Sequence, residues 1–332
     1  MARGPKQILA RCGAGPAVLQ ALGYGIALAQ RRGYGLHLSL LRLHLLESLI
    51  MNKTLLSLAR RWSVGLALGA AALAAQASFT ITLNYSNLTL EQQSYFSAAA
   101  RFWESVLIGY TGYSDANPAP FDGVTISASG ASIDGADAVL ASAGWDTVAS
   151  LNGIYYTRTG GMDFDTADMP GMISNGSFSA VIKHEMAHVL GFGTLWGCPK
   201  AVANCGYGNG LYVEGSGEYK GAKALAEYRT EFNQPLATFV PVELGGGPGT
   251  ANGHWNEVDG GAAGSAPGPG RFELMTGWLN TPSYVSRTTA AQFWDLGYAV
   301  NLSAVPESAA WLLLLAGLPL AGFAAWRRRQ AA

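Results

Sequence analysis

Charged side chains are scarce in this chain of 332 residues, of which they make up 13%. Their distribution is uneven, because residues 78–307 contain 9 lysines and arginines against 21 aspartates and glutamates. A body this acidic argues against a nucleic-acid-binding protein, which needs basic residues to contact phosphates. A phosphate-binding loop is missing as well, since no G-x-x-x-x-G-K-[S/T] motif accompanies the glycine-rich stretches 245–253 and 260–270. With 43 glycines, the chain is expected to form many loops around a modest core.

Histidine is rare too, and two of the five histidines belong to one short motif. His184, Glu185 and His188 form an HExxH sequence inside residues 178–190, which contain no proline or glycine and are followed by Gly191. This pattern predicts a helix that ends at the glycine. Because four residues turn a helix by about 400°, both imidazoles lie on one face and can bind one metal ion. Glu185, about 100° round from His184, can reach a water on that ion without binding the metal.

A catalytic zinc ion needs a third protein ligand beside its water, and the remaining histidines narrow the choice. His37 and His44 precede a predicted signal peptide, so the mature chain would keep one further histidine, His254. We therefore expect His254 to be the third ligand, with Glu257 and Asp259 as substitutes. Zinc suits this set because it accepts neutral imidazole and can lower the pKa of a bound water to about 7.

Three segments together resemble the leishmanolysin-like branch of the metzincin metallopeptidases: HEMAHVLGFG at 184–193, GHWNE at 253–257 and FELMTGW at 272–278. Most metzincins place the third histidine three residues after the glycine of the motif, where this chain has Thr194. Leishmanolysin-like members instead insert a long segment before a histidine that is followed by tryptophan, as His254 is here. The similarity extends over about residues 161–298.

The resemblance implies a fold and a role for each site residue. His184, His188 and His254 would hold zinc, and Glu185 would be the general base of a metalloendopeptidase. Met275 would form the Met-turn, a bend beneath the metal. The fold would be α+β, with a twisted sheet and a long backing helix before the HExxH helix and a loop-rich C-terminal subdomain after it.

Local patterns agree with an α+β catalytic domain over residues 78–303. A helix is predicted at 89–108, where Thr89 and Gln92 fit a capping box. Alternating or turn-bounded apolar residues predict short strands at 78–85, 123–129 and 153–157.

Residues 51–77 are typical of a signal peptide. A basic start is followed by an apolar run at 64–75 and by Ala-Gln-Ala, which predicts cleavage before Ser78. Because a signal peptide belongs at the N-terminus, we interpret residues 1–50 as a misassigned extension, with a genuine cytoplasmic leader as the alternative.

Cysteine is scarce, and only Cys198 and Cys205 would remain after removal of the signal peptide. In an exported protein, two cysteines this close predict a local disulfide. A cysteine-bound zinc site is the alternative.

Three aspartates, Asp163, Asp165 and Asp168, cluster just before the HExxH helix. Their oxygens could bind calcium, although the spacing is not that of an EF-hand. A solvated acidic turn is the favoured interpretation.

Residues 304–332 resemble a PEP-CTERM sorting signal of Gram-negative bacteria. Pro306 and Glu307 precede an apolar run at 309–326, which is just long enough to span a membrane, and three arginines follow it. The resemblance implies an exosortase-type sorting enzyme as a partner. It also implies a protein that is exported to the cell surface or beyond and is held, transiently or permanently, in the inner membrane. A plain membrane anchor is the alternative, because the second proline of the motif is missing.

The combined prediction is an exported zinc metallopeptidase that acts on protein or peptide substrates and binds no nucleic acid. A non-catalytic zinc-binding protein of the cell surface or exopolysaccharide matrix is the alternative. Retention of Glu185 beside both histidines favours the enzyme, because a scaffold needs only the ligands.

Overall fold

The computed structural model describes residues 7–11, 79–114, 116–197, 208–257 and 268–305. All of them belong to one compact unit. The predicted signal peptide, Cys198, Cys205 and the predicted C-terminal helix lie outside the described residues. Within these ranges, no helix is both long enough and apolar enough to cross a membrane.

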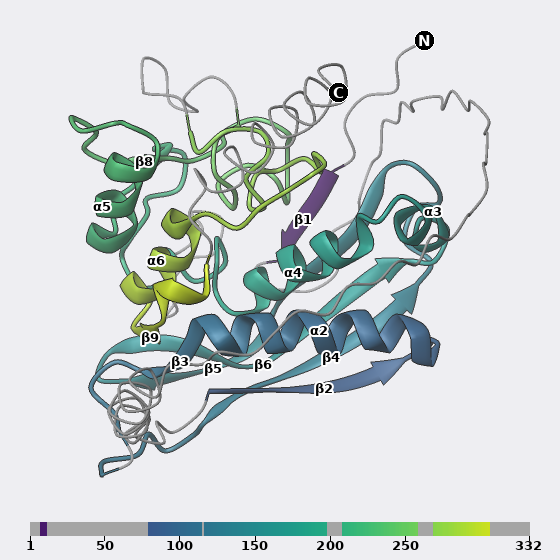
Figure 1. Cartoon of the computed structure of the whole chain (residues 1–332), viewed down its shortest axis with the longest axis horizontal. Coiled ribbons are helices and arrows are strands. Elements are labelled where there is room, and N and C mark those ends of the chain that lie inside the picture. The colour runs from purple at the N-terminus through teal and green to yellow at the C-terminus, as the bar shows by residue number, and fades with distance from the viewer. Residues whose placement is uncertain (1–6, 12–78, 115, 198–207, 258–267, 306–332) are drawn as a thin grey trace, which may run out of the picture. The chain divides into compact units, whose positions relative to one another are not determined.

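A five-stranded mixed sheet forms the base of the N-terminal half (Figure 1). In spatial order its strands are β1 (Gln7–Arg11), β5 (Val139–Leu151), β6 (Ile154–Asp165), β4 (Gly123–Ala131) and β2 (Thr80–Ser86). Strands β2, β4 and β6 run parallel, β5 runs antiparallel to β6, and β1 pairs in parallel with β5. The predicted α+β class is confirmed, and so are the three predicted strands, although β6 is longer than expected.

Strand β5 is the longest of the strands that the sequence patterns did not predict. Its first six residues, VLASAG, are all buried, so they lack the alternation of a half-buried strand. The hairpin to β6 turns at Asn152 and Gly153, whose φ values of 54° and 82° suit a two-residue loop. Strand β1, which was also not predicted, adds residues 7–11 to the edge of the sheet.

Helix α2 (Leu90–Val106) backs the sheet, and the predicted capping box forms at its start. The Gln92 backbone N–H donates to Thr89 Oγ1 (3.2 Å), and the Thr89 N–H donates to the Gln92 side chain (2.7 Å). Trp103 on the buried face donates from Nε1 to the carbonyl oxygen of Lys183 (3.0 Å). This bond ties α2 to the helix that carries the HExxH motif.

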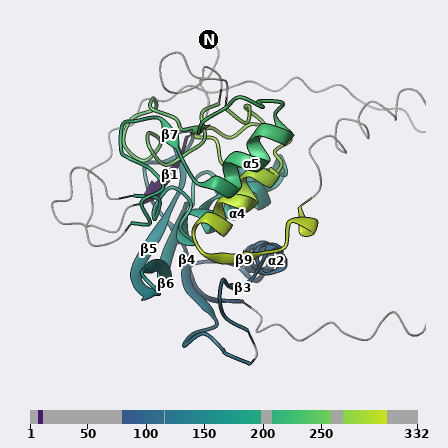
Figure 2. The same cartoon turned by 90° about the vertical axis from the view of Figure 1, so that its left-hand side faces the viewer.

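Helix α4 (Phe178–Val189) contains that motif and lies with α2 on one face of the sheet (Figures 1 and 2). It contacts both β5 and β6. Gly160 on β6 permits the close approach, because a Cβ there would lie 2.5 Å from Cγ1 of Val189. The helix ends as predicted, since Gly191 follows its last turn with a φ of 115°. A short helix, α3 (Met169–Ser174), precedes it.

After α4 the chain is rich in loops, as the resemblance implied. Helices α5 (Ala222–Glu231) and α6 (Arg287–Asp295) pack against each other. The remaining elements are β3 (Leu107–Tyr110), which pairs with β9 (Tyr298–Val300), β7 (Glu218–Tyr219), which pairs with β8 (Val240–Pro241), and a 3₁₀ turn, η1 (Leu302–Ala304).

Helices α5 and α6 are held together by two carboxylates, one at the end of each helix, and each carboxylate caps the start of the other helix. Asp295 at the end of α6 accepts from the N–H groups of Lys223 and Ala224 (2.8 and 2.9 Å). Glu231 at the end of α5 accepts from the N–H groups of the first two residues of α6 (3.1 and 3.0 Å). Each helix start thus gains an anionic partner for its unpaired N–H groups.

Candidate metal centre

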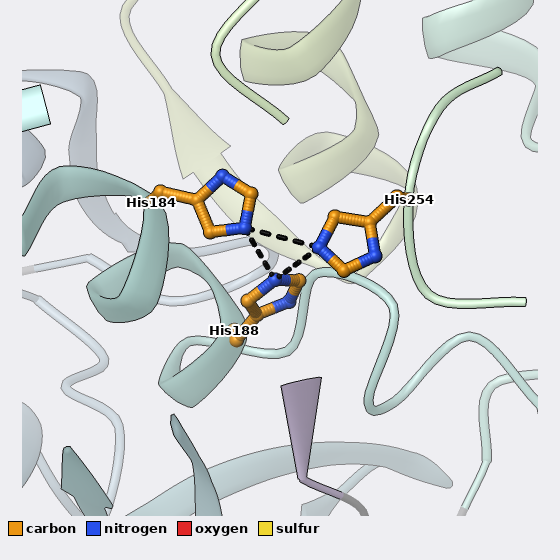
Figure 3. Close-up of side chains that lie close together, drawn as sticks. All are labelled: His184, His188 and His254. Atoms are coloured by element: carbon orange, nitrogen blue, oxygen red, sulfur yellow. Dashed lines mark hydrogen bonds between the residues drawn. The ribbon is translucent and has the colours of Figure 1, made fainter. Parts of the chain in front are cut away.

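The three predicted histidine ligands meet at one point (Figure 3). Their Nε2 atoms form a triangle: His184 to His188 is 2.9 Å, and His254 lies 3.0 Å from each of the others. All three side chains are fully buried. Within the described residues, this is the only group of three or more metal-ligating side chains that come close together.

The protonation of each ring is fixed by its other nitrogen. Each Nδ1 faces a backbone carbonyl oxygen: His184 faces Leu274 (2.6 Å), His188 faces Phe192 (2.9 Å) and His254 faces Thr250 (2.9 Å). Because a carbonyl oxygen only accepts, each Nδ1 must carry the proton. In a neutral ring, Nε2 then presents a lone pair. The three contacts drawn in Figure 3 therefore join acceptor to acceptor, with no proton between them.

The rings are neutral because they are buried. Burial lowers the pKa of His184 and His188 well below the ordinary value, and the neighbouring imidazoles lower it further. Burial also lowers the pKa of His254 to about 4. At pH 7 all three side chains are thus in the form that binds metal.

Three buried lone pairs that face one another repel unless a cation lies among them. Imidazole nitrogens bound tetrahedrally to zinc at about 2.0–2.1 Å are roughly 3.3 Å apart, which is close to the triangle observed. Neutral imidazole is also a borderline ligand that zinc accepts well. The site therefore fits a metal ion such as Zn²⁺.

His254 is placed by a loop that is held at several points. The Glu243 N–H donates to the His254 carbonyl (2.9 Å), and the Asn252 N–H donates to the Glu243 carbonyl (2.7 Å). Gly193, in the loop after α4, packs against Gly253, and a Cβ on Gly193 would collide with the Gly253 carbonyl. With a φ of 72°, Gly193 also has a backbone conformation that favours glycine. This contact brings the two ligand-bearing segments together.

Trp255 anchors the residue next to His254. Its ring stacks on Trp196 (centroids 4.9 Å apart) and makes edge-to-face contacts with Phe192 (5.0 Å) and Tyr219 (5.3 Å). Its Nε1 donates to Oγ1 of Thr289 in α6 (2.8 Å). The tryptophan that marked the resemblance is therefore a packing and hydrogen-bonding anchor for the third histidine.

Met275, which was predicted to form the Met-turn, is fully buried within a turn. Its carbonyl oxygen accepts from the Trp255 N–H (3.0 Å). The preceding residue, Leu274, provides the carbonyl that faces Nδ1 of His184. The turn thus lies against two of the three ligands, while the role implied for the Met275 side chain stays a prediction.

The other residues predicted for the site are Glu185, Glu257 and Asp259. Glu185 is fully buried on α4 beside His184. Glu257 is not part of the histidine group, and its carboxylate accepts from the side chain of Asn280. Asp259 lies outside the described residues.

The three aspartates before α4 accept hydrogen bonds from strand β4 and from the loop that follows it. Asp163 and Asp165 lie at the end of β6 and not in a turn, which corrects that expectation. Asp163 Oδ1 accepts from the Ser129 hydroxyl (2.5 Å), and Asp165 Oδ2 accepts from two backbone N–H groups of the loop after β4 (2.9 Å each). Asp168 Oδ1 accepts from another N–H of that loop (3.1 Å). The three do not form a cation-binding group, so the structure gives the calcium prediction no support.

Two residues at the site were not singled out from the sequence. Gly193 was part of a quoted motif, but its contact with Gly253 depends on a segment 60 residues away in the chain. Glu273 lies two residues before Met275 and is a fully buried carboxylate. An acidic residue inside the apolar stretch FELM was the available signal for it.

A comparison of the chain with models of known protein families finds no match, and a search of curated proteins finds none either. The resemblance therefore depends on the motifs alone. What the structure adds is an α+β fold with a buried triad of His184, His188 and His254, two of them in HExxH spacing on α4. This arrangement is consistent with a zincin-like metallopeptidase.

Proposed function

We propose that this chain is an exported zinc-dependent metalloendopeptidase of the leishmanolysin-like metzincin type. The observation that carries the proposal is the convergence of three neutral imidazoles whose Nδ1 protons are held by carbonyl groups. Their Nε2 lone pairs face one another, and Glu185 is buried beside the first of them. A metal-binding scaffold would need the histidines alone, whereas a hydrolase also needs a base.

A bound zinc ion would supply a Lewis acid for the peptide carbonyl and would lower the pKa of a water to about 7. Glu185 would take a proton from the attacking water and pass it to the leaving amine. Leu274, Phe192 and Thr250 would keep the ligand rings in one tautomer through their carbonyl groups.

The experiment that tests this function is cleavage of casein by the purified chain with zinc supplied, wild type beside Glu185→Gln. The expected result is cleavage by the wild type and a loss of about 100-fold or more in the variant, with the zinc content unchanged. Glu91→Gln serves as the matched control, because Glu91 is exposed at the start of α2.

Each other outcome has a defined meaning. Zinc binding without cleavage by the wild type would favour the non-catalytic surface or matrix protein. Equal cleavage by both would indicate a contaminating peptidase. Loss of zinc from Glu185→Gln would mean that Glu185 is a ligand or a structural residue and not the base.

The same proposal includes export, a PEP-CTERM-type tail processed by an exosortase-type enzyme, and a disulfide between Cys198 and Cys205. The support is the sequence of residues 51–77 and 304–332 and the spacing of the two cysteines. Mass spectrometry of the protein from its native membrane and culture medium would test all three parts. Retention of residues 51–77, an intact tail at 304–332 or two free thiols would contradict the corresponding part.

A further inference from the structure

Glu273 is a carboxylate that is 1% exposed and surrounded by uncharged donors. Its Oε2 accepts from the Met275 N–H (2.6 Å). Its Oε1 accepts from the Ser286 N–H (3.0 Å), the Ser286 hydroxyl (3.0 Å) and the Thr289 hydroxyl (2.6 Å). Both hydroxyl donors belong to the start of α6, where Ser286 is the N-cap. The carboxylate therefore joins the turn at Met275 to the N-terminus of a helix.

This network has a fixed direction. A carboxylate only accepts, so the hydroxyl protons of Ser286 and Thr289 point to Glu273. The Ser286 oxygen is then left to accept from the Thr289 N–H (2.9 Å), and the Thr289 oxygen accepts from Nε1 of Trp255 (2.8 Å). In its ionised form this one group thus orders every donor and acceptor around it.

Two routes lead from Glu273 to the histidines. In the first, its bond to the Met275 N–H holds the turn whose Leu274 carbonyl faces Nδ1 of His184. In the second, Thr289 links it to the Trp255 indole, next to His254. The two routes also join, because the Trp255 N–H donates to the Met275 carbonyl (3.0 Å).

We propose that Glu273 is a positioning residue for the metal centre, which sets the orientation of the His184 and His254 rings through the Leu274–Met275 turn and through Thr289 and Trp255. The proposal rests on the proposed function only in that the three histidines bind a metal. It does not depend on peptide cleavage.

The isosteric change Glu273→Gln removes the carboxylate and keeps the shape of the side chain. An amide offers one accepting oxygen and one donating nitrogen. If its oxygen keeps the three donors at α6, its NH₂ faces the Met275 N–H, which is also a donor. The variant therefore breaks the route to His184 and leaves the side-chain volume unchanged.

The test measures zinc affinity by competition with a chelator and the visible spectrum of the cobalt-substituted full chain. Groups that orient metal ligands typically change affinity by about 10- to 100-fold when altered. We expect Glu273→Gln to weaken zinc binding by about tenfold or more and to change the cobalt spectrum. Asp165→Asn is the structural control, because Asp165 is also a buried carboxylate that accepts from backbone N–H groups, and it lies at the end of β6, outside this network. It should lower stability but leave zinc affinity and the cobalt spectrum unchanged.

A second pair of variants carries the test if Glu273→Gln does not fold. Thr289→Val removes the hydroxyl between Glu273 and Trp255 and should weaken zinc binding, whereas Thr289→Ser keeps the hydroxyl and should restore it. Wild-type zinc affinity and an unchanged cobalt spectrum in Glu273→Gln or Thr289→Val would overturn the proposal. A wild type that binds zinc but cleaves no peptide would refute the peptidase and leave the positioning result intact. A wild type that binds no zinc would overturn both.

Discussion

Replacing Gly193 by alanine should disturb the metal centre from a residue that binds neither metal nor substrate. Gly193 lies in the loop after α4, and its backbone contacts Gly253, the neighbour of His254. An alanine Cβ would approach the Gly253 carbonyl well inside 3.0 Å, a separation that Cβ atoms essentially never pass. Because the obstacle is backbone, the two loops must move apart.

The substitution has two effects, one on stability and one on the position of His254. A left-handed backbone conformation, with a φ of 72°, costs an alanine about 1–2 kcal/mol of stability. The clash requires a displacement on the order of 1 Å next to His254, and a misplacement of that size can reduce the rate about 100-fold. The Nε2 atom of His254 now lies 3.0 Å from those of His184 and His188, so a shift of this size would spoil the triangle.

Gly153→Ala separates the two parts. Gly153 has a φ of 82° in the β5–β6 hairpin, and a Cβ there would meet nothing within 4 Å. Both variants should lose about 1–2 kcal/mol in urea unfolding. Only Gly193→Ala should also show weaker zinc binding in chelator competition and slower casein cleavage. Equal zinc affinity and activity in the two variants would refute the argument that this glycine contact places His254.

Three further predictions concern the Glu273 network, the cap of α5 and the bound metal. Burial raises the pKa of Glu273 to about 7, although its hydrogen bonds lower it, so the folded metal-free protein holds this proton more tightly than the unfolded chain. The stability it contributes should be complete below pH 4.5, and the unfolding free energy should fall by about 3 kcal/mol as the pH rises through 7. Glu273→Gln should remove this pH dependence when the unfolding free energy is measured with urea at several pH values. An unaltered pH dependence would contradict the prediction. Asp295→Ala removes the cap of α5 and should cost about 1–2 kcal/mol of unfolding free energy, so a variant as stable as the wild type would be inconsistent with the capping role. Zinc at 100 times its dissociation constant should raise the unfolding free energy by about 2.7 kcal/mol, and chelator should reverse the gain; no change would argue against a site formed only in the folded state.

Much of the site could be predicted because its chemistry is local. The HExxH spacing fixes which side chains share a helix face, so His184 and His188 required no knowledge of the fold. His254 came from the scarcity of histidine together with the predicted removal of the N-terminal residues. The structure brings these three side chains together and leaves Glu257 outside the group.

The residues that escaped prediction act through contacts that are distant in sequence. Glu273 reaches Ser286 and Thr289 in α6, and Gly193 reaches Gly253 across a long segment. No periodicity or spacing within either segment records such a contact.

The fold shows the same division between local and distant information. Helix α2 was predicted with its capping box, because the pattern lies within a few residues. Strand β5 was missed, because burial on both sides and small side chains remove the alternation by which a half-buried strand is recognised. The aspartates before α4 were placed in a turn, although strand β6 continues through two of them by pairing with β4 and β5.

The most direct test of the central claim is X-ray absorption at the zinc edge of the purified, zinc-loaded protein. We expect three imidazole nitrogens and one oxygen at about 2.0–2.1 Å from zinc, and the loss of one imidazole in His254→Ala. Sulfur ligands at about 2.3 Å, or an unchanged spectrum in His254→Ala, would show that zinc is bound elsewhere and would contradict a three-histidine site.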